Sequence, residues 1–184
     1  MTPHVPAKKR NPLVKIIVVS GLPGSGKSTV AEGIAEQLMV PILSVDPIES
    51  AIIRSGITQS FETGLAAYSV AETLAAEQLN LGICVIIDAV SGVKEARDMW
   101  QNLSVQFHAP LFIIECVLDR DLHKKRIESR ARHMPGIPEV IWNDVENRRK
   151  EYLLWDINRL VLDTSKKIET NLEKALEYIA VPGR

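Results

Sequence analysis

Short apolar runs and longer amphipathic stretches take turns along the chain. The short runs are rich in β-branched residues, which predicts buried strands, and they lie at 15–20, 42–45, 83–88, 111–117 and 160–162. The longer stretches have helical spacing or helix-start signals, and they lie at 27–39, from Pro47 onward, at 61–81, 93–107, 119–133, 139–155 and 168–179. Because strands and helices alternate, the pattern predicts an α/β fold with a parallel sheet and helices on both faces.

Length and composition narrow the class of protein. The 184 residues fit one compact domain, expected over 13–184, after a disordered basic tail over 1–12. The net charge of −1 gives no overall electrostatic case for binding nucleic acid or an anionic membrane. No apolar run approaches the ~20 residues that span a bilayer, so we expect a cytoplasmic protein. Cys84 and Cys116 each lie in an apolar run and are interpreted as buried small hydrophobes.

A glycine-rich loop follows the first predicted strand and precedes a predicted helix. Its sequence, Gly21-Leu22-Pro23-Gly24-Ser25-Gly26-Lys27-Ser28, matches the phosphate-binding pattern G-x-x-x-x-G-K-[ST] in full. Glycines let several backbone N–H groups face one anion, and the N-terminus of the next helix points its positive end there. Lys27 can reach the β- and γ-phosphates of ATP, and Ser28 can place its hydroxyl on Mg²⁺.

With this loop, continued to Thr29, the chain resembles the small P-loop kinases of the AAA-type ATP-binding family. That group includes adenylate, shikimate and gluconate kinases and chloramphenicol phosphotransferase, and the resemblance runs from Lys15 to about Ile179. It implies a P-loop NTPase three-layer sandwich with five parallel strands in the order 2-3-1-4-5. It also implies a helical lid over about 119–150, with ATP and Mg²⁺ as cofactors.

Two aspartates end predicted strands, at the edge where ligands of open α/β sheets bind. Asp46, at the end of the second strand, can accept a proton from an acceptor hydroxyl or hold a magnesium-bound water; alternatively it caps the helix that begins at Pro47. Asp88, at the end of the third strand, looks like the carboxylate that orients the magnesium shell in similar kinases. Many similar kinases carry an arginine three residues after the first aspartate, where this chain has Glu49. The predicted metal ligands are therefore Ser28, Asp46 and Asp88.

The basic helix predicted at 119–133 carries two arginines spaced by four, so Arg126 and Arg130 are expected on one face. The resemblance implies that Arg126 packs against adenine and that Arg130 reaches the transferred phosphate. The alternative is a solvated basic face. In similar kinases the turn with Thr164 and Ser165 lies by the adenine; a plain capping turn is equally consistent with the residues.

Three functions are compatible with these motifs. The first is a kinase that moves the γ-phosphate of ATP to a hydroxyl of a small molecule, using Lys27, Asp46, Arg126 and Arg130. The second is a 5′-hydroxyl nucleic acid kinase, which the near-neutral charge disfavours. The third is a nucleotide-dependent switch without an acceptor. The remaining aromatic and imidazole side chains are interpreted as core tryptophans (Trp100, Trp142 and Trp155, all on helices) and surface or loop histidines (His4, His108, His123 and His133).

Overall fold

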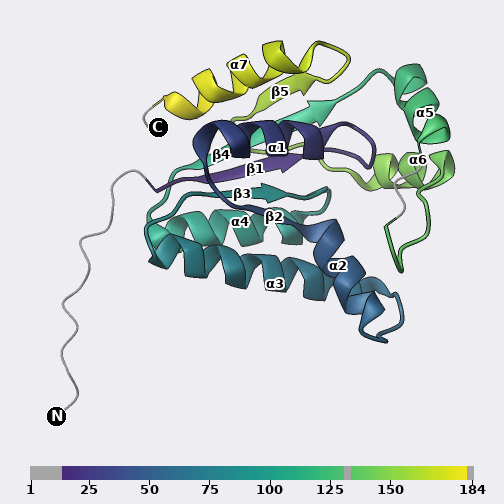
Figure 1. Ribbon diagram of the computed structural model, residues 1–184, viewed down its shortest axis with the longest axis horizontal. Coiled ribbons are helices and arrows are strands. Elements are labelled where there is room, and N and C mark those ends of the chain that lie inside the picture. The colour runs from purple at the N-terminus through teal and green to yellow at the C-terminus, as the bar shows by residue number, and fades with distance from the viewer. Residues whose placement is uncertain (1–13, 131–133, 182–184) are drawn as a thin grey trace.

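The computed structural model describes residues 14–130 and 134–181, and within these ranges the chain forms a five-stranded parallel sheet (Figure 1). The strand order is β2-β3-β1-β4-β5, which confirms the predicted order. The predicted tail, residues 1–12, lies outside the described residues. The strands are β1 (Ile16–Ser20), β2 (Ile42–Ser44), β3 (Val85–Asp88), β4 (Leu111–Val117) and β5 (Leu160–Asp163).

Helices cover both faces of the sheet, so the chain forms a three-layer sandwich (Figure 1). Two helices pack on one face: α1 (Lys27–Leu38) and α7 (Ile168–Ala180). Two pack on the other face: α3 (Phe61–Asn80) and α4 (Lys94–Phe107). Three more lie beyond the carboxyl ends of the strands: α2 (Val45–Arg54), α5 (Arg120–Ser129) and α6 (Trp142–Glu151).

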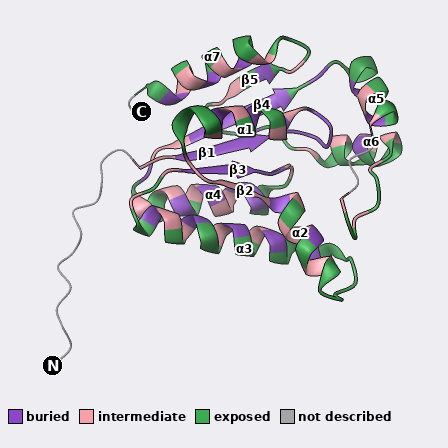
Figure 2. Cartoon of the chain, in the orientation of Figure 1, coloured by how far each residue is buried: buried purple, intermediate pink, exposed green. Residues whose placement is uncertain are grey.

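The core follows directly from the apolar strands. The central strand β1 pairs with β3 and β4, and all five of its residues are buried (Figure 2). Helix α3 packs closely because small residues face the sheet at every fourth position: Ala67, Ala71 and Ala75 are all fully buried. No helix in the described part of the chain has the length and apolarity needed to cross a membrane.

Several predicted boundaries were wrong in ways that matter for the site. Strand β2 ends at Ser44 and α2 begins at Val45, so Asp46 lies in the first helical turn rather than at the end of a strand. Pro47 is tolerated in that turn because its missing N–H would have no helical partner. The cap residue of α2 is Ser44, so Asp46 is not the cap.

Helices α5 and α6 are both shorter than predicted. Helix α5 ends at Ser129 and Arg130 is extended, because the helix buries only His123 and Ile127 and gains little from further turns. Helix α6 begins at Trp142 instead of 139, where the carboxylate of Asp144 accepts a hydrogen bond from the N–H of Ile141.

Cys116 is buried, as predicted, whereas Cys84 is only partly buried. Of the three tryptophans, Trp100 is buried on α4 and Trp142 is half-buried on α6, whereas Trp155 is buried in the segment that follows α6.

Candidate active site

The phosphate loop spans the gap between β1 and α1 at the carboxyl edge of the sheet. Gly26 is the N-cap of α1 and has a φ of 92°, in the left-handed region that favours glycine. A Cβ at Gly26 would lie 3.2 Å from both Arg126 Nη1 and Thr164 Cβ, so the loop runs close to both side chains. The loop therefore has the backbone form and the helix N-terminus that a phosphate-binding loop needs.

Lys27 lies between the two predicted aspartates. Its Nζ atom is 3.7 Å from Asp46 Oδ2 and 3.8 Å from Asp88 Oδ1, and its side chain is only 4% exposed. The three groups carry one positive and two negative charges. This arrangement suits a site for a divalent cation and phosphate, because the carboxylates attract the cation and the Lys27 ammonium attracts the phosphate oxygens.

Asp88 has the features expected of a magnesium-shell carboxylate. Ser44 Oγ donates to Asp88 Oδ2 at 3.2 Å, while the buried Asp88 Oδ1 accepts no hydrogen bond within the described residues. Mg²⁺ binds proteins through one or two carboxylates and keeps waters and substrate phosphates as its other ligands. The described part of the chain contains no cluster of three or more His, Cys, Asp or Glu side chains that could hold a metal.

The turn after β5 contacts the phosphate loop. Thr164 Oγ1 donates to the carbonyl of Ser25 at 2.5 Å, and Arg126 Nη2 donates to the carbonyl of Thr164 at 3.2 Å. Arg126, Thr164 and the loop therefore meet at one place. Ser165 is exposed, and its N–H donates to the carboxylate of Asp163, which is an ordinary turn contact. The roles of Thr164 and Ser165 beside adenine stay predictions.

Arg126 and Arg130 lie in different surroundings, because Arg126 is within α5 whereas Arg130 follows its last residue and has an extended backbone. The prediction that they share one helical face was wrong. Arg130 instead lines a cavity beside Pro23, together with Asp46, Glu49 and an arginine of α6 that sequence reasoning missed, Arg148. This cavity lies next to the predicted transfer site, and its other walls come from Gln59 and the segment 134–140.

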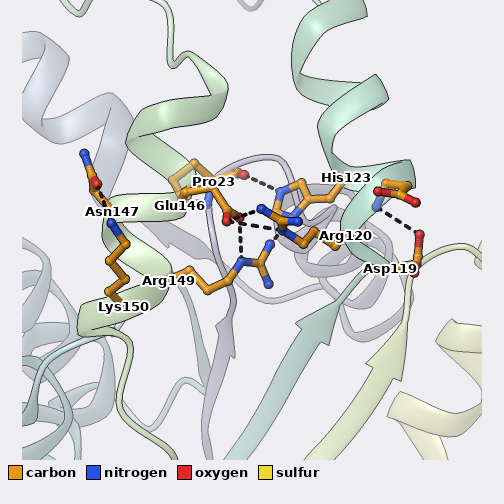
Figure 3. A network of polar contacts seen from close by, with 9 residues as sticks. Pro23, Asp119, Arg120, His123, Glu146, Asn147, Arg149 and Lys150 are labelled. Carbon is orange, nitrogen blue, oxygen red and sulfur yellow. Dashed lines mark hydrogen bonds and ion pairs between the residues drawn. The ribbon is translucent and has the colours of Figure 1, made fainter.

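His123 is the clearest miss of the sequence analysis. It was interpreted as a surface or loop residue, but it is 1% exposed and its Nε2 lies 2.8 Å from the carbonyl oxygen of Pro23 (Figure 3). Arg149 Nη2 lies 3.3 Å from its Nδ1. The spacing of His123 and Ile127 by four could have signalled a buried face. His108 is exposed, as predicted, while His4 and His133 lie outside the described residues.

A second cavity of about 200 Å³ lies between the loop, β4 and the end of α6. Its walls include Gly21, Ser25, Cys116 and Tyr152. Burial raises the pKa of the Cys116 thiol to about 12, so this thiol is protonated and unreactive at neutral pH. Burial likewise raises the pKa of the Tyr152 phenol to about 12.

Comparison with known proteins identifies the family. Residues 16–151 match the model of a family described as an AAA domain. The chain therefore belongs to this family, and its resemblance to the small P-loop kinases is confirmed.

Individual relatives agree with this assignment. Adenylate kinase 2 of Schistosoma mansoni is 31% identical over 178 residues, which cover 88% of this chain and 72% of the relative. A protein of Mycobacterium tuberculosis is 29% identical over 131 residues, and the match covers 64% of this chain but only 26% of that longer protein.

Two solved structures share the fold. A protein from Chloroflexus aurantiacus superposes with a TM-score of 0.75 at 23% identity, covering 90% of this chain and 98% of the other. The APS kinase CysC of Mycobacterium tuberculosis, in complex with AMPPNP and APS, has a TM-score of 0.70 at 18% identity, covering 90% and 97%.

Proposed function

We propose that this protein is an ATP-dependent kinase that transfers the γ-phosphate to a hydroxyl of a small molecule, with Mg²⁺ as the metal. The observation that carries the proposal is the position of Lys27 between Asp46 and Asp88 at the end of a phosphate loop. Small P-loop kinases need these groups because phosphoryl transfer depends on positioning and charge neutralisation more than on covalent chemistry.

Each residue has a role that its surroundings support. Lys27 neutralises the phosphates, and Mg²⁺, held through Ser28 and Asp88, would stabilise the charge that develops on the transferred group. Asp46 accepts the proton of the acceptor hydroxyl as that oxygen bonds to the γ-phosphorus and the bond to the bridging oxygen of ADP breaks. Alternatively, Asp46 holds a magnesium-bound water, because Lys27 Nζ lies 3.7 Å from Asp46 and 3.8 Å from Asp88, which brings Asp46 near the carboxylate proposed to hold the metal.

The arginines would act on either side of the loop. Arg126 lies beside Thr164 and suits the adenine side, because a guanidinium stacks well on a ring. Arg130 lines the cavity beside Asp46, so it suits the transferred phosphate, and Arg148 borders the same cavity. In this proposal the segments with α5 and α6, over about 119–150, act as a lid over the nucleotide.

The cavity beside Asp46 is the proposed acceptor site. Asp46, Glu49 and Glu139 contribute three carboxylates to its walls, and Arg130 and Arg148 contribute two guanidinium groups. A long nucleic acid strand would need an extended basic surface, whereas this cavity is lined by charges of both signs. A small acceptor therefore fits better than a 5′-hydroxyl oligonucleotide.

Label transfer from γ-labelled ATP with Mg²⁺ tests the proposal. The acceptor panel contains sugars, sugar acids, nucleosides, nucleotides, aminoglycoside and phenicol antibiotics, and 5′-hydroxyl oligonucleotides. We expect transfer to one class of small acceptor. Lys27→Ala should lower the rate by about 100-fold or more, since it removes the positive charge that neutralises the phosphates. Asp46→Asn should lower it by about 100- to 10,000-fold, since it removes the base.

Two exposed residues of the same types serve as matched controls, Lys174→Ala on α7 and Asp156→Asn before β5. Both should retain the wild-type rate. ATP binding without transfer to any acceptor would favour a nucleotide-dependent switch, and transfer to oligonucleotides alone would favour the nucleic acid kinase.

A further inference from the structure

His123 occupies an unusual position for a polar ring. It lies on α5, is 1% exposed, and stands between the phosphate loop and α6. The Trp142 ring of α6 packs edge-on against it, with the ring centres 5.5 Å apart. A buried polar ring is costly unless both of its nitrogens have partners.

The partners of His123 determine where its proton lies. The carbonyl oxygen of Pro23 can only accept, so Nε2, 2.8 Å away, must carry the hydrogen and donate it. The guanidinium of Arg149 can only donate, so Nδ1, 3.3 Å away, must be unprotonated and accept. The neutral ring with its proton on Nε2 is the form that satisfies both contacts. A charged ring would present a second N–H to Arg149 and lose that hydrogen bond.

The charges around the ring also favour the neutral form. Arg126 lies one turn along α5, and Arg149 and Glu146 face the ring from α6; Arg120 of α5 pairs with Glu146 at 2.8 Å. From the phosphate loop, the uncharged carbonyl of Pro23 faces the ring. Burial lowers the pKa of His123 below its usual 6.5, and Arg149 and Arg126 lower it further, against the opposing effects of Pro23 and Glu146.

The contact with Pro23 falls within the phosphate loop, beside Gly24. Proline has no N–H, so its carbonyl is the backbone group through which a neighbour can hold this residue by a hydrogen bond. The next residue, Gly24, also lies against α5: a Cβ there would be 3.4 Å from His123 Nε2. His123 thus connects the loop to Arg149, which Glu146 holds at 3.0 Å from within α6.

We propose that neutral His123 is a positioning residue of the phosphate loop, which holds Pro23 and Arg149 in place, and that protonation of His123 weakens nucleotide binding. This inference rests on the nucleotide-binding function proposed above. A preorganised loop binds more tightly because less conformational freedom is lost when the phosphates arrive.

The test is the dissociation constant of Mg-ADP, measured by calorimetry between pH 5 and 8 on the full chain. His123→Gln retains an N–H donor of similar reach and cannot become charged. His123→Phe keeps the ring against Trp142 but removes both hydrogen bonds. The exposed His108, at the end of α4, gives the control His108→Asn, which suits its left-handed backbone (φ 51°). Because ADP itself titrates near pH 6, the informative quantity is the difference between wild type and variant.

At pH 8 we expect His123→Phe to bind about 5- to 30-fold more weakly than wild type, which corresponds to the loss of the hydrogen bond to the loop and the unpaired Pro23 carbonyl; the lost contact with Arg149 does not touch the loop directly. His123→Gln should stay within about threefold of wild type at pH 8 and should lose the extra weakening that wild type shows toward pH 5. His108→Asn should behave as wild type does throughout.

Equal affinity of His123→Phe and wild type would overturn the inference, as would identical pH profiles of wild type and His123→Gln. Failure of the folded wild type to bind Mg-ADP at any pH would instead refute the proposed function. In that event ¹⁵N NMR of the His123 ring still tests its protonation state. A charged ring, or a neutral ring with its proton on Nδ1, at pH 7 would contradict the assignment of the proton to Nε2.

Discussion

Replacing Gly24 with alanine tests whether α5 holds the phosphate loop by close packing. Gly24 has a φ of 82°, which costs an L-residue about 1–2 kcal/mol. A Cβ there would also overlap Ile127 Cδ1 and lie 3.2 Å from Ile127 Cγ1. Ile127 is 5% exposed in a small core with Leu22 and Val145, so its side chain has little room to move. Such overpacking costs about 1–3 kcal/mol more.

We therefore expect Gly24→Ala to lower the free energy of unfolding by about 2–5 kcal/mol, the sum of the two effects. Gly56 is the matched control, since it has a φ of 100° and, apart from its two chain neighbours, no described residue has an atom within 4 Å of the position that a Cβ would take there. Gly56→Ala should cost only the backbone strain of about 1–2 kcal/mol. Urea denaturation measures both changes, with the slope used to check that unfolding stays two-state.

A second substitution separates the backbone strain at position 24 from the steric overlap with Ile127. Ile127→Val removes the Cδ1 atom, and alone it should cost about 0.5–1.5 kcal/mol. Combined with Gly24→Ala it should relieve the overlap, so that the double variant is more stable than the sum of the single effects by about 1–3 kcal/mol. Additive effects, or a Gly24→Ala cost no greater than that of Gly56→Ala, would show that α5 does not press on the loop.

Two further predictions concern the contacts around the loop. Thr164→Val removes the hydrogen bond to the Ser25 carbonyl and should lower the free energy of unfolding, measured by urea denaturation, by about 1–3 kcal/mol. The control Thr73→Val loses only an exposed hydrogen bond within α3 and should change that free energy by no more than about 0.5 kcal/mol. Equal effects of the two substitutions would contradict this prediction. The pKa of His123 is lower in the folded than in the unfolded state, so the unfolded chain binds more protons just below pH 6.5. Stability should therefore rise with pH between the lowered pKa and 6.5, and His123→Gln should flatten that rise; an unchanged slope would argue against a buried neutral ring.

The sequence by itself determined the class of fold and the identity of the phosphate loop. Both are encoded locally: strands buried on both faces need uninterrupted apolar runs, and a loop that surrounds phosphates needs glycines at set positions followed by Lys27 and Ser28. The strand order came from the resemblance and is confirmed. Asp88 was located correctly because it ends a strand whose residues are all buried.

Tertiary structure alone decided how the loop is held and what lies beside it. The position of Asp46 within α2, the departure of Arg130 from α5 and the burial of His123 are seen only in the folded chain. His123 meets Pro23 across 100 positions and Arg149 across 26. Hydrogen bonds and close packing of this kind follow no local period, so only the folded chain reveals that a histidine on a basic helix is joined to the phosphate loop.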